Sequence, residues 1–249
     1  MIERAFRKGK PTAVALVINS PGGSPVQAGI INDEIRRLKA LHKKPVYVVV
    51  EETCASAAYY IAAAADKIYM GYSDAGNVLG ALYRAGIGRL CHGPMPADIR
   101  RAGGEAAVTR ALDWIVHQSP HALEPHVRAG EKHAALNLMT LAMMVGTPLM
   151  PDLFDHVLMV EEVSEYLYGY DRAFFHVTSH LRSVGLTGLR LGRVSDVPDN
   201  DRPFGEGAEE IAQRWCAKTG INYFGRADIG HDADNRIVPF GLATSSAAP

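Results

Sequence analysis

Three side chains far apart in the chain have the types needed for nucleophilic catalysis: Ser73, Glu161 and His231. Ser73 follows an apolar, strand-like run, residues 67–70, and precedes a predicted helix that opens at Ala75. A serine on a tight turn from strand to helix is a nucleophile elbow, because the turn exposes the hydroxyl and directs the following backbone N–H groups at the bond it attacks. With a histidine as the base and a carboxylate to orient it, the three residues predict a Ser-His-Glu triad.

Each of these residues also has a simpler interpretation. Ser73 and Asp74 are both strong N-cap residues, so their role would be only to cap the next helix. Glu161 ends an apolar strand, where a carboxylate is costly unless it is paired or exposed. Glu162 competes for the same role, because strand alternation places the two glutamates on opposite faces. His231 is one of ten histidines; a histidine moves protons near neutral pH, but a surface loop position is the alternative.

Further residues are candidates for binding the substrate. The backbone N–H of Asp74 is the expected oxyanion donor, since an elbow aims it correctly. Gly22 and Gly23, in a Pro-Gly-Gly turn after a predicted strand, are candidates for the second donor, and a purely structural turn is their alternative. His92 is a candidate pocket residue that equally fits a strand-end cap. Arg100 and Arg101 are expected on a solvated face.

A parallel sheet is predicted to position these residues. The apolar runs 13–18 and 45–50 are typical of strands buried on both faces, and an amphipathic helix over 27–41 completes a parallel crossover unit. Further strands are predicted at 67–70, 87–95, 157–161, 189–194 and 222–225, and further helices at 55–65, 105–116, 137–145, 170–184 and 206–219.

Two prolines break the periodicity within residues 118–126 and indicate a domain boundary. We therefore expect an α/β fold with two domains. A parallel-sheet N-terminal domain, residues 1–118, bears the nucleophile elbow. A smaller, mixed α/β C-terminal domain, residues 119–249, bears Glu161 and His231, so that the site lies where the domains meet.

Composition excludes several classes of function. The chain has 249 residues, a formal net charge of -1, 47% hydrophobic and 21% charged residues, which is typical of a globular protein and gives no basic footprint for nucleic acid. The longest small-apolar run, Tyr59–Ala65, is too short to span a bilayer. The first residues do not resemble a signal peptide.

Cysteine and histidine spacing predicts neither a metal nor another cofactor. The three cysteines, Cys54, Cys91 and Cys216, form no Cys-x-x-Cys pair, and the histidines of residues 121–133 lack clean ligand spacing. The cysteines are odd in number and widely spaced, which fits a protein of the reducing cytoplasm. Cys54 is interpreted as a small buried hydrophobe.

Several short runs in the first 69 residues match a known pattern: Val17-Ile18-Asn19-Ser20-Pro21-Gly22-Gly23, Lys44-Pro45-Val46-Tyr47-Val48, Ala55-Ser56-Ala57-Ala58-Tyr59-Tyr60 and Ala64-Ala65-Asp66-Lys67-Ile68. Residues 3–69 resemble the signal peptide peptidase A (protease IV) family, which uses a serine–lysine dyad on a crotonase-like fold. The resemblance implies Ser56 as an alternative nucleophile, with the Pro-Gly-Gly turn supplying oxyanion donors. The sequence departs from the family because no lysine lies between Lys67 and Lys132, where some members carry the dyad base.

A second set of runs lies further along: Gly71-Tyr72-Ser73-Asp74, His92-Gly93-Pro94-Met95, Asn137-Leu138, Val145-Gly146-Thr147-Pro148, Val160-Glu161-Glu162-Val163, Tyr168 with Asp171-Arg172, Ile229-Gly230-His231 and Pro239-Phe240-Gly241. Residues 67–242 resemble the LD-carboxypeptidase (muramoyltetrapeptide carboxypeptidase, microcin-immunity peptidase) family. The resemblance implies a serine carboxypeptidase of peptidoglycan recycling in the cell wall, with its triad on Ser73, Glu161 and His231. It also implies a murein tetrapeptide substrate and a homodimer as one possible assembly.

The two resemblances leave three hypotheses open. The chain is an LD-carboxypeptidase that removes the terminal D-alanine, a signal-peptide-peptidase-type endopeptidase that uses Ser56, or a catalytically impaired hybrid whose triad is misplaced. A natural fusion, a recombined hybrid and a designed chimera, joined near residues 67–71, all fit this arrangement.

Overall fold

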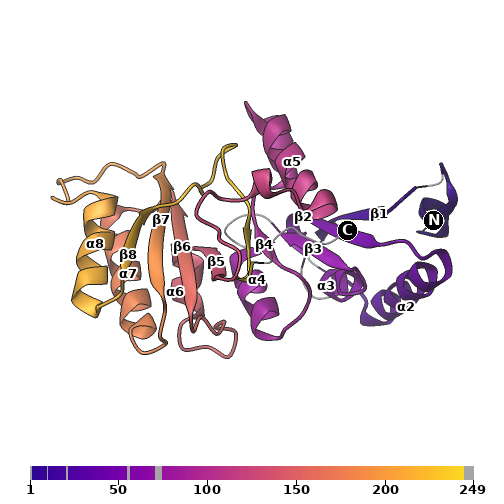
Figure 1. The fold of residues 1–249 in the computed structure, drawn as a ribbon, viewed down its shortest axis with the longest axis horizontal. Helices are drawn as coiled ribbons and strands as arrows, with labels where there is room; N and C mark the ends of the chain where they lie inside the picture. The colour runs from indigo at the N-terminus through magenta and orange to yellow at the C-terminus, as the bar shows by residue number, and fades with distance from the viewer. Residues whose placement is uncertain (1, 10, 21, 55–56, 71–74, 244–249) are drawn as a thin grey trace.

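The computed structural model describes residues 2–9, 11–20, 22–54, 57–70 and 75–243. The predicted nucleophile Ser73, its neighbour Asp74 and the alternative nucleophile Ser56 lie outside the described residues. Two sheets follow one another along an elongated molecule, with α2 at one end and α8 at the other (Figure 1). The α/β fold class predicted from the sequence is confirmed.

The first sheet consists of parallel strands in the order β1-β2-β3. Their bounds are β1 Val14–Ser20, β2 Val46–Cys54 and β3 Lys67–Met70. Helix α2 (Pro25–His42) connects β1 to β2, and α3 (Ala57–Ala62) precedes β3, as in the predicted crossover unit. Helix α1 (Ile2–Arg7) precedes the sheet and α4 (Ala75–Arg84) follows it.

Helix α2 begins and ends where local chemistry requires. The Ser24 hydroxyl accepts a hydrogen bond from the backbone N–H of Gln27, and Pro25 follows, whose fixed φ suits a first helical position. Lys43 ends the helix in the left-handed region at φ 51°.

Strand β1 differs from its prediction. It lies at the edge of the sheet and alternates between buried or half-buried residues and exposed ones, with Val17 60% exposed. The prediction that this strand is buried on both faces is wrong, because only one of its faces has helices packed on it. An all-apolar run alone does not distinguish a central strand from an edge strand.

The second sheet has the order β10-β5-β6-β7-β8, in which β5 to β8 are parallel and β10 is antiparallel to β5. Its bounds are β5 Lys132–Asn137, β6 His156–Val163, β7 Gly188–Ser195, β8 Tyr223–Arg226 and β10 Gly241–Leu242. Helices α6 (Leu138–Met144), α7 (Leu167–Leu181) and α8 (Ala208–Thr219) pack on one face.

Strand β5 was not predicted from the sequence. Its polar residues and two alanines have low strand propensity, yet it is almost entirely buried between β10 and β6. Burial against both neighbours determines its conformation. The helix predicted over 137–145 is confirmed as α6, which the side chain of Asn137 caps by accepting from the N–H of Thr140.

A two-stranded antiparallel ribbon connects the two parts of the chain. Strand β4 (Cys91–His92) pairs with β9 (Val238–Pro239), and we call the pair the β4–β9 ribbon. Between them in the sequence lie a 3-10 helix (Pro96–Arg100), α5 (Gly104–Leu112), a π-helical turn (Asp113–His117) and a 3-10 turn (Pro120–Ala122). The ribbon crosses the boundary predicted at residue 118. Within the described residues, no helix is long and apolar enough to cross a membrane.

Candidate active site

Glu161 and His231 form the centre of the candidate site. Nδ1 of His231 lies 2.5 Å from Oε2 of Glu161. The Glu161 side chain is fully buried and that of His231 is 11% exposed. A buried carboxylate that accepts from Nδ1 fixes the imidazole tautomer and leaves Nε2 as the nitrogen that can accept a proton. The predicted pairing of these two residues is therefore present in the structure.

Glu162, the competing glutamate, has a different role. Its carboxylate accepts hydrogen bonds of 2.9 Å from the Asn137 side chain and from the backbone N–H groups of Met139 and Val163. Burial raises the pKa of Glu162, while these hydrogen bonds oppose the shift. Glu162 thus stabilises the start of α6 on the face of β6 opposite to Glu161, as strand alternation predicts.

Gly192 on β7 allows His231 to approach β6. A Cβ atom at this glycine would lie 2.6 Å from Cγ1 of Ile229, 2.8 Å from its carbonyl oxygen and 2.9 Å from Cβ of Glu161. Contacts this short do not occur between real side chains. The missing side chain is therefore what allows the segment before His231 to pass directly over Glu161.

An arginine on β7 fixes the loop that carries His231. The Arg193 guanidinium forms a two-point ion pair with Asp232, and its Nη1 lies 3.0 Å from Oδ1 of Asp228. The backbone N–H of Arg193 also donates to the carbonyl of Ile229 at 2.8 Å. Arg193 therefore holds residues on both sides of His231, and a two-point pair of this kind limits the rotation of the loop.

Two further arginines and one asparagine bind the backbone of the same loop. Arg101 donates to the carbonyl of His231 at 2.6 Å, and Arg110 donates to the carbonyls of Ala233 and Asn235. The fully buried Asn235 side chain accepts from the N–H of Gly230. Arg101 is exposed as predicted, and its guanidinium also binds the backbone of the His231 loop. The sequence prediction missed these contacts, because hydrogen bonds to backbone carbonyls leave no motif.

His92 lies at the same site, on the β4–β9 ribbon. Its side chain is buried, with Nε2 3.5 Å from the Asn235 side chain. Burial lowers the pKa of His92 to about 4, although the charge of Glu161 acts in the opposite direction. His92 is consequently neutral near pH 7 and adds a polar, uncharged wall beside the Glu161–His231 pair.

Helix α4, which follows the Ser73 segment in the sequence, begins near this pair. Helix α4 starts at Ala75 and packs against α6, where a Cβ at Gly76 would lie 2.7 Å from Oγ1 of Thr140. Thr140 is one helical turn beyond Asn137, which pairs in register with Glu161. The start of α4 therefore lies near the carboxyl end of β6.

Gly22 and Gly23 lie in a different part of the molecule. They line a groove of about 370 Å³ at the carboxyl end of β1, together with Ala57 and Ala58 of α3. Gly22 has a φ of 122°, a conformation that glycine adopts readily. The resemblance to signal peptide peptidases implies that the turn containing Gly22 and Gly23 supplies oxyanion donors. Neither Glu161 nor His231 lines the groove.

The histidines and cysteines outside the candidate site have other surroundings. Among the described residues, no group of three or more His, Cys, Asp or Glu side chains is arranged to hold a metal ion. His126 instead pairs with the buried carboxylate of Glu124, which also accepts from the N–H of Asp228. Cys54, Cys91 and Cys216 are free thiols and buried, and burial raises the pKa of Cys54 to about 11.

Two family models match the chain. Residues 134–245 match the LD-carboxypeptidase C-terminal domain, and residues 39–79 match peptidase family S49. Both resemblances predicted from the sequence, to LD-carboxypeptidases and to signal peptide peptidases, are therefore confirmed. The first match contains Glu161 and His231, whereas the second contains Ser73, so the predicted triad draws on both parts.

Proteins of known structure share the fold of this chain. The structure of muramoyltetrapeptide carboxypeptidase from Oxalobacter formigenes superposes with a TM-score of 0.65 at 19% identity, covering 92% of this chain and 96% of that one. This similarity establishes the fold.

Curated relatives cover parts of the chain. A candidate carboxypeptidase of Synechocystis sp. is 25% identical over 194 residues, which is 70% of this chain and 59% of that protein. The Na+/H+ antiporter NhaA of Brucella melitensis is 44% identical over 82 residues, 33% of this chain. The chain spans 11% of the length of that antiporter.

Proposed function

We propose that this protein is a serine-type LD-carboxypeptidase that removes the terminal D-alanine from murein tetrapeptides through Ser73, His231 and Glu161. The observation that carries the proposal is the hydrogen bond between the Glu161 carboxylate and Nδ1 of His231. A buried carboxylate in this position stabilises the imidazolium that forms when the histidine acts as a general base. The match of residues 134–245 to the LD-carboxypeptidase C-terminal domain supports the reaction class.

The proposed reaction proceeds in two steps. Nε2 of His231 takes the hydroxyl proton of Ser73 while the serine oxygen forms a bond to the amide carbonyl carbon. The backbone N–H of Asp74 stabilises the oxyanion. The C–N bond then breaks, and the imidazolium gives its proton to the leaving amine of D-alanine. Water, deprotonated by His231, releases the acyl group and restores Ser73.

The position of α4 supports Ser73 as the nucleophile. Its first residues pack against Thr140, next to the strand end that pairs with Glu161. The N–H groups at the start of a helix favour a developing negative charge. We therefore assign the nucleophile to Ser73, two residues before this helix in the sequence, with the Glu161–His231 pair as its base.

Incubation of murein tetrapeptide with the wild type and with Ser73→Ala, followed by HPLC, tests the proposal. The wild type should release D-alanine and the tripeptide. The variant should release neither, while its circular dichroism and melting temperature match the wild type. Equal product from both proteins would refute Ser73 as the nucleophile.

A second candidate function is a signal-peptide-peptidase-type endopeptidase that uses Ser56. The match of residues 39–79 to peptidase family S49, and the groove formed by Gly22, Gly23 and α3, favour it. A fluorophosphonate probe distinguishes the two functions, because peptide mapping identifies the modified serine. An adduct on Ser56 supports the endopeptidase, and an adduct on Ser73 supports the carboxypeptidase.

A catalytically impaired hybrid is the third alternative. A displacement of about 1 Å at a catalytic group costs roughly a hundredfold in rate. Comparing active-site titration with turnover of the tetrapeptide tests it. Stoichiometric labelling of Ser73 with negligible turnover would indicate an impaired triad.

The cellular setting and assembly belong to the same proposal. The three free, buried thiols are those of a protein kept in a reducing compartment, so we place the enzyme in the cytoplasm. We propose a homodimer on the basis of the family resemblance. Sedimentation equilibrium of the purified chain would give the mass of either a monomer or a dimer.

A further inference from the structure

A second concave site lies on the other side of the β4–β9 ribbon. It is a cavity of about 230 Å³, bounded by β3, by residues 88–91, by the π-helical turn and by residues 239–242. Cys91 lines this cavity, whereas the next residue, His92, faces Asn235 and the Glu161–His231 pair. Neighbouring residues of a strand point to opposite faces, so the ribbon separates the cavity from the candidate active site.

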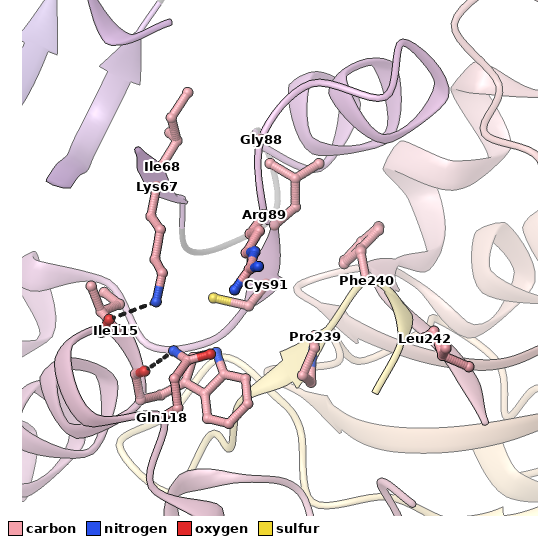
Figure 2. A pocket seen from close by; sticks show the side chains of 12 residues that line it. Lys67, Ile68, Gly88, Arg89, Cys91, Ile115, Gln118, Pro239, Phe240 and Leu242 are labelled. Carbon is pink, nitrogen blue, oxygen red and sulfur yellow. Dashed lines mark hydrogen bonds between the residues drawn. The ribbon is translucent and has the colours of Figure 1, made fainter. Parts of the chain in front are cut away.

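Two cationic side chains enter this cavity. Figure 2 shows the Lys67 amine and the Arg89 guanidinium directed into the same space, with Gln118 below them. Nζ of Lys67 donates to the carbonyl of Ile115 at 3.1 Å and lies 5.9 Å from the ring centroid of Tyr47. Burial, and secondly the charge of Arg89, lower the pKa of Lys67.

No carboxylate among the described residues balances the positive charge of this cavity. Neither Lys67 nor Arg89 forms a salt bridge with any carboxylate that the structure describes. A lysine ammonium has three donors, of which the Ile115 carbonyl takes one. Two like charges in a partly buried cavity repel each other, so an anion between them would stabilise both.

The walls of the cavity are mainly apolar. Trp114, Leu90 and Phe240 line it. A hydrated inorganic ion would leave these surfaces in contact with water, whereas a flat hydrocarbon body would bury them. The volume lies below the range of roughly 300–1,000 Å³ typical of sites for drug-sized ligands. The cavity therefore suits a small molecule with a single ring.

We propose that this cavity is a binding site for a small aromatic monocarboxylate, whose carboxylate lies between Lys67 and Arg89 and whose ring packs on Trp114. The site is distinct from the proposed peptidase centre, and the inference does not depend on that function. A guanidinium and an ammonium together can accommodate both oxygens of one carboxylate.

Tryptophan fluorescence provides a direct test. The chain has two tryptophans, so Trp215→Phe leaves Trp114 as the only reporter. Phenylacetate should change its emission saturably. The uncharged isostere phenylacetamide and inorganic phosphate should each bind at least tenfold more weakly. Calorimetry on the unsubstituted chain should give the same order of affinities.

Variants of the two cations complete the test. Lys67→Met and Arg89→Gln should each weaken phenylacetate binding at least tenfold, whereas Arg84→Gln, an exposed cation outside the cavity, should not change it. If either the Lys67 or the Arg89 variant fails to fold, the other one still tests the proposal. Four results would each overturn the proposal. Two concern the ligands: equal affinity for phenylacetate and phenylacetamide, or phosphate binding as tight as phenylacetate binding. The other two are unchanged binding in both variants and the lack of a saturable signal by either method. Ser73→Ala should bind phenylacetate normally, so this outcome is independent of the peptidase.

Discussion

The imidazole Nδ1 of His231 lies 2.5 Å from the Glu161 carboxylate, although 70 positions separate the two residues in the sequence. Glu161 is supplied by the end of β6, and His231 by a loop that three arginines hold from β7 and the α5 region. The pair is thus a product of tertiary structure, and the following predictions test what holds it and what it does.

Replacing Glu161 should remove activity while sparing the fold. In Glu161→Gln the amide would donate to Nδ1, which favours the tautomer that carries its proton on Nε2 and cannot accept the serine proton. We expect turnover of the tetrapeptide to fall by about 10³-fold or more.

The neighbouring glutamate provides the matched control. Glu162→Gln weakens three hydrogen bonds at the start of α6 and should cost about 1–2 kcal/mol of stability in urea unfolding. Turnover per folded molecule should stay within twofold of the wild type. A reversed pattern, with Glu162 essential for turnover and Glu161 dispensable, would contradict the assignment.

Loosening the loop around His231 should lower turnover without removing a catalytic group. Arg193→Gln loses the ion pairs with Asp228 and Asp232. We expect kcat to fall about 10- to 100-fold, because the base is displaced. Arg190→Gln, which removes contacts to the carbonyls of Phe224 and Arg226 and to the Phe224 ring, should leave kcat nearly unchanged. Steady-state kinetics of both variants measures these two kcat values.

A methyl group at Gly192 should destabilise the site from within. Gly192→Ala places Cβ within 2.9 Å of Ile229 and Glu161, and overpacking of this kind costs about 1–3 kcal/mol. Gly29→Ala, on an open position of α2 with nothing within 4 Å, should instead stabilise the protein by about 0.5–1 kcal/mol. Chemical denaturation should therefore give opposite signs for the two alanines.

Acid should destabilise the protein partly through His92. Burial lowers its pKa to about 4 in the folded state, against about 6.5 in the unfolded chain. The unfolded state therefore binds the proton first, and this contribution to stability is lost as the pH falls from about 6.5 to about 4, by roughly 3 kcal/mol in total.

The His92→Gln variant isolates this contribution. Its free energy of unfolding should depend less on pH across that window than the wild-type value. His176→Gln is the control, because the His176 side chain is exposed on α7. An unchanged pH slope in His92→Gln would show that folding does not lower the pKa of His92.

The sequence predicted much of the framework because branched apolar runs and amphipathic helices carry a clear periodicity. Strands β1, β2 and β6 and helices α2 and α7 lie where the patterns indicate. The Glu161–His231 pairing could be predicted because residue type, order and family resemblance all favoured it.

Other features depend on contacts that have no local pattern. Strand β5 is a strand because β6 and β10 flank it, and its alanines gave no strand signal. The exposure of β1 depends on how many strands the sheet has. Arg193 and Arg101 act through carboxylates and carbonyls that only the folded loop brings to them.

The β4–β9 ribbon has a consequence for how such a protein can change over evolution. Both of its strands belong to residues after the first 69, and so do Glu161 and every arginine that holds the His231 loop. A different N-terminal segment can therefore replace the residues before residue 70 without changing these contacts of the His231 loop. Such an exchange must preserve the docking of α4, whose glycines fit against α6, and the contacts of Tyr47 and Lys67 with the π-helical turn.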